Sequence, residues 1–467
     1  MFESDTIAAV SSPPGTGAIA VIRLSGPRAV EICEQIFIPA SGISIAGAEP
    51  NTMHYGTICD DNEIIDEVVT GIFRSPHSYT GEDLVEISCH GSLYIQKRIL
   101  ELMISRGART AGPGEFTKRA FMNGKLDLTQ VEAVADLIYS GSRTQHRVAM
   151  NQMRGGFAKE LAKLRERLVD FISLIELELD FSEEDVEFAD RRKLKELLQV
   201  ITDKIKNIKD SFELGNVIKS GIPVAIAGNT NSGKSTLLNL LLKEEKAIVS
   251  EIAGTTRDSI EDVINIKGLN FRLIDTAGLR HTEDVIEKLG IERTWKKIKQ
   301  ASIVLQVLDA GSPLEKLKKQ ISELTESIRD EEKKVIPLLN KIDLLKEDDL
   351  QKLIDQLKLI LPEGRIIPIS AKKGTNLSLL EEALLDSTGI NAINENDVII
   401  TNTRHFDALG KALLSLERTS EGLQTNIPGD LLALDVRESL HYLGEITGEI
   451  TDSEVLGNIF RKFCIGK

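Results

Sequence analysis

Gly228-Asn-Thr-Asn-Ser-Gly-Lys-Ser235 matches the pattern Gly-x-x-x-x-Gly-Lys-Ser/Thr, and this stretch decides the fold of the middle of the chain. A short apolar run, Val224–Ala227, precedes it, and a helix-like run, Thr236–Leu242, follows it. The glycines let backbone N–H groups curl around phosphate groups, and the N-terminus of the helix adds its positive dipole. In this pattern Lys234 reaches the β- and γ-phosphates and Ser235 ligates magnesium. The stretch therefore predicts a strand–loop–helix nucleotide site.

Three polar motifs end later apolar runs, in the order expected for a guanine-nucleotide-binding domain. Asp275-Thr-Ala-Gly278 places a carboxylate near magnesium and a glycine N–H near the γ-phosphate. Asn340-Lys-Ile-Asp343 offers a carboxylate that accepts both the ring N–H and the amino group of guanine, which adenine does not present together. In Ser370-Ala-Lys372 a backbone N–H meets the guanine carbonyl oxygen.

A fourth motif, Gly254-Thr-Thr-Arg-Asp258, lies between the phosphate-binding loop and Asp275, where a switch threonine closes on magnesium. Each motif is weak alone, but five in order indicate a GTPase domain. The residues expected to contact the nucleotide come from these motifs and from the segment before Gly254. They are Asn231, Ser232, Gly233, Lys234, Ser235, Thr236, Ser250, Glu251, Ile252, Ala253, Gly254, Thr255, Thr256, Asp275, Thr276, Ala277, Gly278, Asn340, Lys341, Ile342, Asp343, Ser370, Ala371 and Lys372.

One departure from the common pattern informs the mechanism. Many small GTPases carry a glutamine just after the Asp-x-x-Gly motif, and it orients the attacking water. Here the residues after Gly278 are Leu279, Arg280 and His281. Another group must therefore position water, and the nearby acids are Glu283, Asp284 and Glu287.

Composition excludes several classes of protein. The 467 residues suffice for two to four domains of roughly 100–200 residues, and 41% hydrophobic with 28% charged residues is ordinary globular composition. No apolar run approaches the roughly 18 residues needed to span a bilayer, and the acidic start gives no sign of an export segment. Four scattered cysteines without a Cys-x-x-Cys pair argue against a disulfide framework or a zinc ribbon. We therefore expect a protein of the reducing cytoplasm.

The net charge, 57 − 72 = −15, does not indicate a nucleic-acid partner by itself. An acidic chain binds nucleic acid only through a local basic surface or a basic partner. Residues 1–123 hold 9 Lys/Arg against 15 Asp/Glu, and residues 391–467 hold 7 against 12, so neither end is a basic arm.

Hydrophobic patterning divides the chain into segments. Residues 1–123 mix short β-type runs with turn signals, which predicts a small α/β domain. Residues 124–220 predict long helices, and residues 221–390 alternate continuous apolar runs with helical stretches, as in a parallel sheet with crossover helices. Residues 391–467 return to helical spacing. The helical positions expected in the core are Leu161, Leu164, Leu168, Phe171, Ile175, Leu179, Phe406, Leu409, Leu413, Leu416, Leu431, Leu434, Leu440 and Leu443. We expect one bundle interrupted by the inserted domain, with two separate helical domains as the alternative.

Several further motifs give the chain a family resemblance. Pro13-Pro-Gly-Thr-Gly17, Ile22-Arg-Leu-Ser-Gly26, Tyr79-Thr-Gly-Glu-Asp83, Lys125-Leu-Asp-Leu128 and the terminal Cys464-Ile-Gly-Lys467 accompany the nucleotide motifs. Together they resemble the tRNA modification GTPase family MnmE (TrmE) over essentially the whole chain.

The resemblance implies a multidomain α/β plus all-α protein. It has an N-terminal folate-binding and dimerisation domain, a helical bundle split in sequence, and an inserted Ras-like P-loop G domain. The family is a homodimer that works with the FAD protein MnmG to add an aminomethyl or carboxymethylaminomethyl group to the wobble uridine of certain tRNAs. Methylene-tetrahydrofolate, or its 5-formyl analogue, occupies the folate site, and potassium takes the place of an arginine finger.

The resemblance also assigns roles residue by residue. Potassium ligands correspond to Asn231, Ser250, Ile252 and Thr255, with Ser250 where the family usually has threonine. Magnesium ligands correspond to Ser235 and Thr256, and the catalytic set to Lys234, Thr256 and the water-positioning Glu287. Folate-binding positions correspond to Arg23, Glu86, Lys125 and Lys467. Cys464 is a candidate reactive thiol, and a structural cysteine is the equal alternative.

Two other functions fit the same motifs. A ribosome-assembly GTPase shares the switch chemistry, but it usually carries a recognisable RNA-binding domain, and the sequence shows no basic tail or basic Gly-x-x-Gly loop. A one-carbon transferase with a regulatory GTPase is the second alternative.

Overall fold

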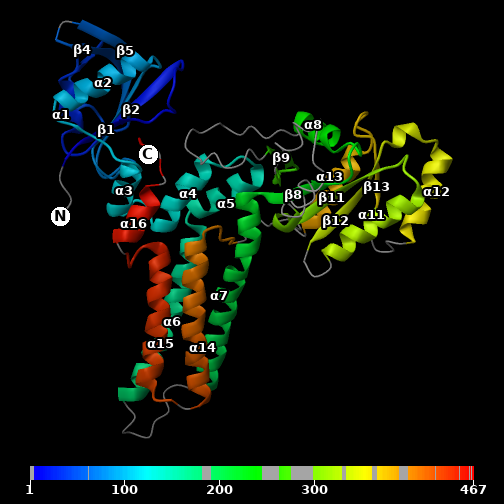
Figure 1. Cartoon of the computed structure of the whole chain (residues 1–467). Helices are drawn as coiled ribbons and strands as arrows, with labels where there is room; N and C mark the ends of the chain where they lie inside the picture. The colour runs from blue at the N-terminus through cyan, green and yellow to red at the C-terminus, as the bar shows by residue number, and fades with distance from the viewer. Residues whose placement is uncertain are drawn as a thin grey trace. The chain divides into compact units, whose positions relative to one another are not determined.

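The computed structural model describes residues 5–61, 63–180, 191–244, 262–274, 298–328, 333–359, 365–388, 398–425, 427–451, 453–461, 463 and 465–466. The chain divides into two compact units. The first contains Met1–Ile138, Gln152–Thr202 and Ala408–Lys467, and the second contains Tyr139–Asn151 and Asp203–Asp407. An N-terminal α/β part, a helical part split in sequence and an inserted α/β part are all present, as expected (Figure 1). The boundaries expected at residues 123, 220 and 390 stay predictions.

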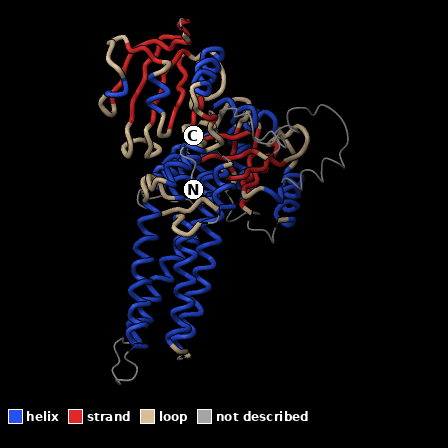
Figure 2. The backbone as a smooth tube through the Cα atoms, turned by 90° about the vertical axis from the view of Figure 1, so that its left-hand side faces the viewer, coloured by secondary structure: helices blue, strands red, loops and turns tan. Residues whose placement is uncertain are grey.

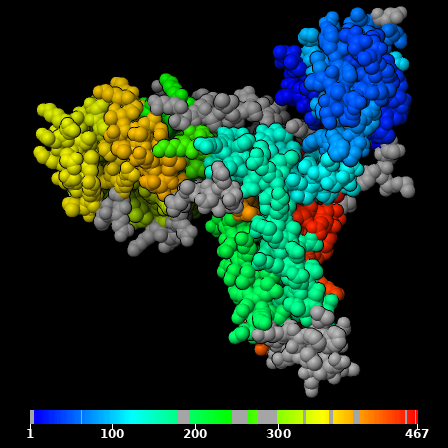
Figure 3. All heavy atoms as spheres, turned by 180° about the vertical axis from the view of Figure 1, so that it is seen from behind, coloured from blue at the N-terminus to red at the C-terminus, as the bar shows by residue number. Residues whose placement is uncertain are grey.

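The first unit begins with a seven-stranded sheet in the order β3-β4-β5-β6-β2-β1-β7. All pairs are antiparallel except β1 with β7. The strands and their helices form one compact lobe, blue in Figure 3. The strands are β1 (Ile7–Val10), β2 (Ile19–Ser25), β3 (Phe37–Pro39), β4 (Thr52–Asp60), β5 (Glu63–Phe73), β6 (Leu84–His90) and β7 (Arg109–Thr110).

Alternation along the strands separates a core face from a polar face, because successive side chains of a strand point to opposite sides. On β2 the side chains of Ala20, Ile22 and Leu24 are buried in the core that also includes residues of α1 (Ala29–Glu34) and α2 (Leu93–Ser105). Arg23 falls between these positions and is paired in register with Glu86 on β6. The sequence therefore places both on the face away from that core.

Helices complete the first unit. They are η1 (Ile45–Gly47), α3 (Glu115–Met122), α4 (Leu128–Ile138), α6 (Gly156–Asp180), α15 (Gly429–Thr447) and α16 (Ser453–Phe460), with parts of α7 (Arg191–Ser220) and α14 (Thr403–Gln424). Helices α6 and α15 run side by side (Figure 1). The long helices of this part are drawn in blue in Figure 2. Arg437 of α15 forms an ion pair with Glu176 of α6.

The apolar stripe of α6 is buried as the spacing predicts, from Leu161 to Ile175. The side chain of Leu179 lies outside the described residues. The expectation for α15 is partly wrong, since Leu431 and Leu434 are exposed. The buried face of α15 instead follows Leu432, Val436, Ser439 and Leu443. The buried face therefore begins one residue after the predicted one, at Leu432 instead of Leu431. The leucine spacing misplaced it because some leucines of α15 lie on the exposed face.

The second unit holds a six-stranded sheet in the order β13-β12-β11-β8-β10-β9, parallel except for β9. The strands are β8 (Ile222–Ala227), β9 (Asp262–Ile266), β10 (Leu269–Leu273), β11 (Ile303–Asp309), β12 (Lys334–Asn340) and β13 (Ile367–Ile369). The helical elements are α5 (Arg143–Met153), α8 (Lys234–Glu244), α11 (Leu314–Ser327), η3 (Ile342–Leu344), α12 (Glu347–Lys358) and α13 (Leu377–Thr388). Because parallel strands end at the same edge, the loops after β8, β11, β12 and β13 meet there.

Among the described helices, none is both long enough and apolar enough to cross a lipid bilayer.

Candidate functional site

The loop between β8 and α8 has the conformation of a phosphate-binding loop. Gly228 has φ +150, and a Cβ at this position would lie 2.4 Å from the carbonyl oxygen of Val307. Gly233 has φ +98, and a Cβ there would lie 2.1 Å from Nδ2 of Asn340. Only glycine meets both conditions, since positive φ and close approach of neighbouring atoms exclude a side chain. The loop leads directly into the N-terminus of α8, where backbone N–H groups attract anions.

Lys234 folds back over this loop. Its Nζ donates hydrogen bonds to the carbonyl oxygens of Gly228 and Asn229, at 2.8 and 2.7 Å. Burial lowers the pKa of the Lys234 ammonium below its ordinary value. The two carbonyl oxygens that bond the ammonium carry no net charge. A polyphosphate bound here would place negative charge beside the ammonium and favour its protonated form.

Asn340 ties together the loops that are expected to hold phosphate and guanine. Its side chain is 2% exposed. Nδ2 donates to the carbonyl oxygen of Ser232 at 2.8 Å, and Oδ1 accepts from the N–H of Ala371 at 2.9 Å. One buried amide therefore sets the spacing between the phosphate-binding loop, the end of β12 and the loop after β13.

Two side chains next to Asn340 are also held in place. Lys341 has φ +70, and its Nζ lies 2.6 Å from Oδ2 of Asp309 at the end of β11. Asp343 accepts a 2.7 Å hydrogen bond from Oγ of Ser370, and this bond holds the pKa of the Asp343 carboxyl below its ordinary value. The carboxylate is thus ionised and oriented where a guanine edge would need an acceptor.

The structure brings three segments that carry expected nucleotide contacts to one edge of the sheet. The expected contacts that it describes are Asn231, Ser232, Gly233, Lys234, Ser235, Thr236, Asn340, Lys341, Ile342, Asp343, Ser370, Ala371 and Lys372, and their binding of nucleotide stays a prediction. Sequence reasoning missed Asp309, although it directly follows the apolar run Ile303–Leu308. The other expected positions lie outside the described residues. They are Ser250, Glu251, Ile252, Ala253, Gly254, Thr255, Thr256, Asp275, Thr276, Ala277, Gly278 and Glu287.

The N-terminal candidate site centres on Arg23 and Glu86. Nε of Arg23 donates to Oε1 of Glu86 at 2.6 Å. The Arg23 guanidinium also lies over the ring of Tyr79, 5.4 Å from its centroid. Lys125 donates from Nζ to the carbonyl oxygen of Pro76 at 3.0 Å, in the segment that carries Tyr79. Three of the four expected folate positions are therefore arranged around β2, β6 and one loop.

Lys467 and Cys464 lie outside the described residues, but the residues beside them are placed. Ile465 forms an antiparallel bridge with Pro113. The carbonyl oxygen of Gly466 accepts a 2.9 Å hydrogen bond from Oγ of Ser11. The C-terminal tail thus docks beside the start of the N-terminal sheet.

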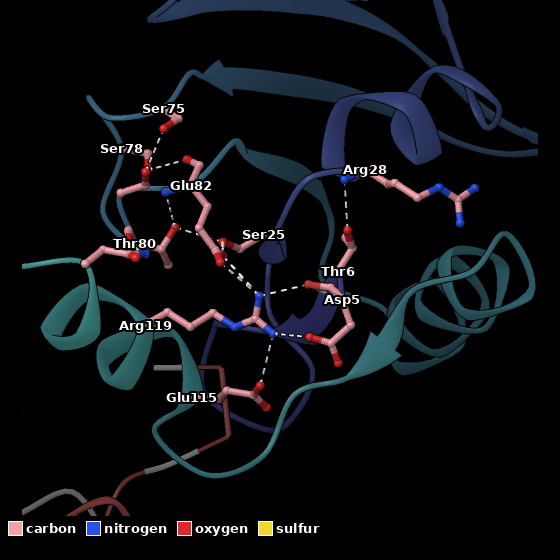
Figure 4. A network of polar contacts seen from close by, with 12 residues as sticks. Asp5, Thr6, Ser25, Arg28, Ser75, Ser78, Thr80, Glu82, Glu115 and Arg119 are labelled. Atoms are coloured by element: carbon pink, nitrogen blue, oxygen red, sulfur yellow. Dashed lines mark hydrogen bonds and ion pairs between the residues drawn. The ribbon is translucent and has the colours of Figure 1, made fainter. Parts of the chain in front are cut away.

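A partly buried ion network supports this region (Figure 4). Arg119 of α3 contacts Asp5, Glu82 and Glu115, with nitrogen–oxygen distances of 2.6, 3.1 and 3.2 Å. Glu115 also accepts the N–H of Gly112 at 2.8 Å, next to the residue that pairs with the tail. The network therefore links the segment before β1, the loop before β6 and the segment that receives the tail.

Among the described residues no group of three or more His, Cys, Asp or Glu side chains is arranged to hold a metal ion.

The buried parallel strand, glycine loop and helix, with Asn340 joining them to an acidic guanine-binding loop, define a P-loop guanine-nucleotide-binding protein. A family model for the MnmE helical domain matches residues 128–464, and a model for the GTP-binding protein TrmE N-terminus matches residues 6–125. The chain belongs to the tRNA modification GTPase MnmE family.

Full-length relatives agree with this assignment. The tRNA modification GTPase MnmE of Bacteroides thetaiotaomicron is 52% identical, and that of Flavobacterium psychrophilum is 51% identical, each over 100% of both chains. Among solved structures, a point variant of Era from Aquifex aeolicus bound to GDP and AlF4− is 30% identical. That similarity covers 41% of this chain and 65% of Era, with a TM-score of 0.29.

Proposed function

We propose that this chain is a potassium-dependent GTPase that works with MnmG on tRNA. The pair would add an aminomethyl or carboxymethylaminomethyl group to C5 of the wobble uridine, with methylene-tetrahydrofolate as the one-carbon source. Family membership makes the chain a GTP hydrolase of tRNA modification. The observation that carries the finer proposal is that one chain presents both the Asn340-centred guanine site and the Arg23–Glu86 pair.

In the proposed GTPase reaction, the phosphate-binding loop and Lys234 hold the phosphates, and Asp343 selects guanine. Magnesium would be held by the hydroxyls of Ser235 and Thr256. Potassium would be held by Asn231, Ser250, Ile252 and Thr255, whose side-chain and carbonyl oxygens are hard ligands, and it would supply positive charge at the transition state. An arginine finger in that role is worth roughly 10³–10⁵ in rate.

Glu287 is proposed to position the attacking water, since no glutamine follows Gly278. Glu287→Ala should then bind GTP normally and lose most turnover, because positioning rather than affinity is removed. Asn231→Ala should lose stimulation by potassium. Turnover is measured in potassium, rubidium and sodium buffers at several protein concentrations, since G domains that act as a homodimer need association. Equal rates in potassium and sodium, with no concentration dependence, would refute this mechanism and leave the GTPase assignment intact.

The folate site is proposed to use Glu86 for the pterin edge and Arg23, Lys125 and Lys467 for the anionic groups. The residues fit such a ligand. Nε of Arg23 is engaged by Glu86, whereas its two terminal nitrogens contact no hydrogen-bond acceptor among the described residues. A paired guanidinium with free terminal nitrogens suits a carboxylate or carbonyl oxygen. Cys464 is proposed as a thiol at the same site.

The partners and the location follow from the same proposal. The chain would act as a cytoplasmic homodimer that assembles with MnmG, and FAD would enter only through MnmG. Because the chain has a net charge of −15, a partner that supplies a basic surface would strengthen the binding of tRNA to the complex. The alternative, a ribosome-assembly GTPase, predicts co-purification with ribosomal subunits rather than with MnmG.

The deciding experiment is mass spectrometry of wobble uridine in tRNA from a deletion strain. Complementation with the wild-type chain should restore the modified nucleoside, and complementation with Arg23→Ala or Asp343→Asn should not. Normal modification in the uncomplemented deletion strain would overturn the proposed function.

A further inference from the structure

The loop between β5 and β6, residues Arg74–Asp83, closes on itself. Nη1 of Arg74 lies 2.8 Å from Oδ2 of Asp83, and the N–H of Ser75 donates to Oδ1 of Asp83 at 3.0 Å. Oγ of Ser75 donates to the carbonyl oxygen of Gly81 at 2.9 Å. These bonds join the two ends of the loop, so its middle residues have little freedom to shift.

The same loop is fastened to neighbouring elements (Figure 4). Oγ1 of Thr80 lies 2.8 Å from Oγ of Ser25, and both side chains are buried. Ser25 also donates to Oε2 of Glu82 at 2.8 Å, and Glu82 pairs with Arg119 of α3. The β5–β6 loop is therefore held against β2 on one side and against α3 on the other.

Tyr79 lies in the middle of this loop and is itself fixed. Its Oη lies 2.9 Å from Oγ1 of Thr117, a fully buried residue of α3. Its ring packs beside the apolar cluster that contains Ile7 and Phe116. Burial raises the pKa of the Tyr79 phenol, so the ring stays neutral across physiological pH. A neutral aromatic ring with a fixed plane is a good platform for a cation.

Arg23 is held by that platform and by one carboxylate. Glu86 engages Nε at 2.6 Å, and the ring of Tyr79 lies 5.4 Å from Cζ. Glu86 restrains the Nε edge of the guanidinium, and the Tyr79 ring restrains its face. The two terminal nitrogens are left to bind another group. The side chain of Arg23 is 20% exposed, so a ligand has access to it.

We propose that Tyr79 is a positioning residue that aims Arg23 at the anionic part of a reduced folate. This inference rests on the proposed function of the Arg23–Glu86 site. Tyr79 does not need to touch the ligand. It fixes the rotation of the guanidinium, so that less side-chain freedom is lost when the terminal nitrogens bind an anion.

The same loop also contacts and positions Lys125. Lys125 donates to the carbonyl oxygen of Pro76 at 3.0 Å. A Cβ built on Gly81 would lie 3.3 Å from Cγ of Lys125, so the lysine stem runs along the loop. The β5–β6 loop therefore contacts two of the cations expected in the folate site, and a shift of the loop would move both.

The test compares Tyr79→Leu, Tyr79→Phe and Thr117→Val in the full-length chain. Binding of 5-formyl-tetrahydrofolate is measured by calorimetry, and thermal stability and GTP turnover are measured beside it. Tyr79→Leu should weaken folate binding by roughly tenfold, because a cation–π contact is lost. Tyr79→Phe keeps the ring and should weaken it by only about two- to threefold. Tyr55→Leu is the matched control, since Tyr55 is an exposed tyrosine of β4 that bonds Glu67.

A double-mutant cycle distinguishes positioning from a general structural role. If Tyr79 acts through Arg23, Tyr79→Leu should cost little further affinity in an Arg23→Gln background, because glutamine carries no cation for the ring. Tyr79→Phe and Thr117→Val should likewise be non-additive, because both remove the same hydroxyl contact. In the modification reaction with MnmG, the KM for folate should rise while kcat is retained.

Each outcome is decisive. Wild-type folate affinity in Tyr79→Leu, with loss in Arg23→Ala, overturns the inference and leaves the folate site standing. Full additivity of Tyr79→Leu with Arg23→Gln also overturns it. So does a Tyr79→Phe variant in which the free energy of folate binding and the free energy of unfolding fall by the same amount. Absence of folate binding by the wild-type chain overturns both the inference and the proposed folate site.

Discussion

Replacement of Arg119 by methionine should lower the free energy of local unfolding of α3, which packs against β1, by about 2–4 kcal/mol. The Arg119 side chain is 12% exposed, and its guanidinium contacts the carboxylates of Asp5, Glu82 and Glu115. Removing one partner of a buried ion pair costs roughly 3–5 kcal/mol, because the remaining charge is left without compensation. Arg109 still pairs with Asp5 and Glu115 in the variant, which lowers the figure.

The cost should depend on pH in a defined direction. Burial alone would raise the pKa of Asp5 and of Glu115, but hydrogen bonds from Arg109 and Arg119 outweigh it and hold both pKa values below their ordinary range. A carboxyl whose folded-state pKa is depressed stabilises the protein above its unfolded-state pKa, and this stabilisation is lost as the pH falls through the folded-state pKa. The difference between wild type and Arg119→Met should therefore be full at pH 7 and shrink below about pH 4.

Hydrogen exchange by mass spectrometry measures this effect locally, which matters in a chain with two compact units. Peptides covering residues 109–122 should lose protection by roughly 30- to 800-fold at pH 7. Arg418→Met is the control, because Arg418 is 51% exposed and pairs with Asp435 and Glu438 on the surface of the helical part. Exposed pairs are worth about 1 kcal/mol or less. A loss below threefold in Arg119→Met, or an equal loss at pH 7 and at a pH well below 4, would refute the reasoning.

Three further predictions concern the nucleotide site and the tail. Asp343→Asn should shift preference from GTP to xanthosine triphosphate, and competition binding would contradict the assignment if GTP affinity were kept. GTP affinity should fall as the pH rises through the lowered pKa of Lys234, because bound phosphate favours the protonated ammonium. Calorimetry measures GTP affinity against pH, and Lys234→Arg should make this dependence flatter because the arginine cation does not titrate. Gly466→Ala should release the tail, since φ is +95 and a Cβ would lie 2.2 Å from the carbonyl oxygen of Val10. Proteolysis of the tail and folate titration should both change while GTP binding stays normal, and an unaltered cleavage rate would count against it.

Sequence patterns predicted the central strands of both sheets because those strands carry continuous or strongly β-branched apolar runs. Strands β8, β11 and β12 are examples, because they coincide with the continuous apolar runs Pro223–Ala227, Ile303–Leu308 and Val335–Leu339. Strands β4 and β9 were missed. Their sequences mix polar and apolar residues, since β4 pairs near the edge of its sheet and β9 forms the edge of the other. An edge strand is defined by its neighbour more than by its own side chains.

The candidate sites show a similar division. The phosphate-binding loop and the guanine motifs are contiguous in sequence, so their residues could be named before the structure. The network of Arg119 was not predicted, because Asp5, Glu82 and Glu115 lie 114, 37 and 4 residues from it. No local period links Arg119 to Asp5 or Glu82, and the i,i+4 spacing between Glu115 and Arg119 indicates only an ordinary helical ion pair. The family resemblance supplied Arg23 and Glu86, and the register of β2 with β6 explains why they meet.

The contact between Ser11 and Gly466 joins positions 455 residues apart. Synthesis at about 5–20 residues per second separates the appearance of these residues by roughly 20–90 s. Within that interval the strands of the N-terminal sheet and the phosphate-binding loop are synthesised before the tail. The surface beside Pro113 stays uncovered until Ile465 has been synthesised. Synthesis that ended before Ile465 would therefore give a chain whose nucleotide site can form but whose surface beside Pro113 stays uncovered.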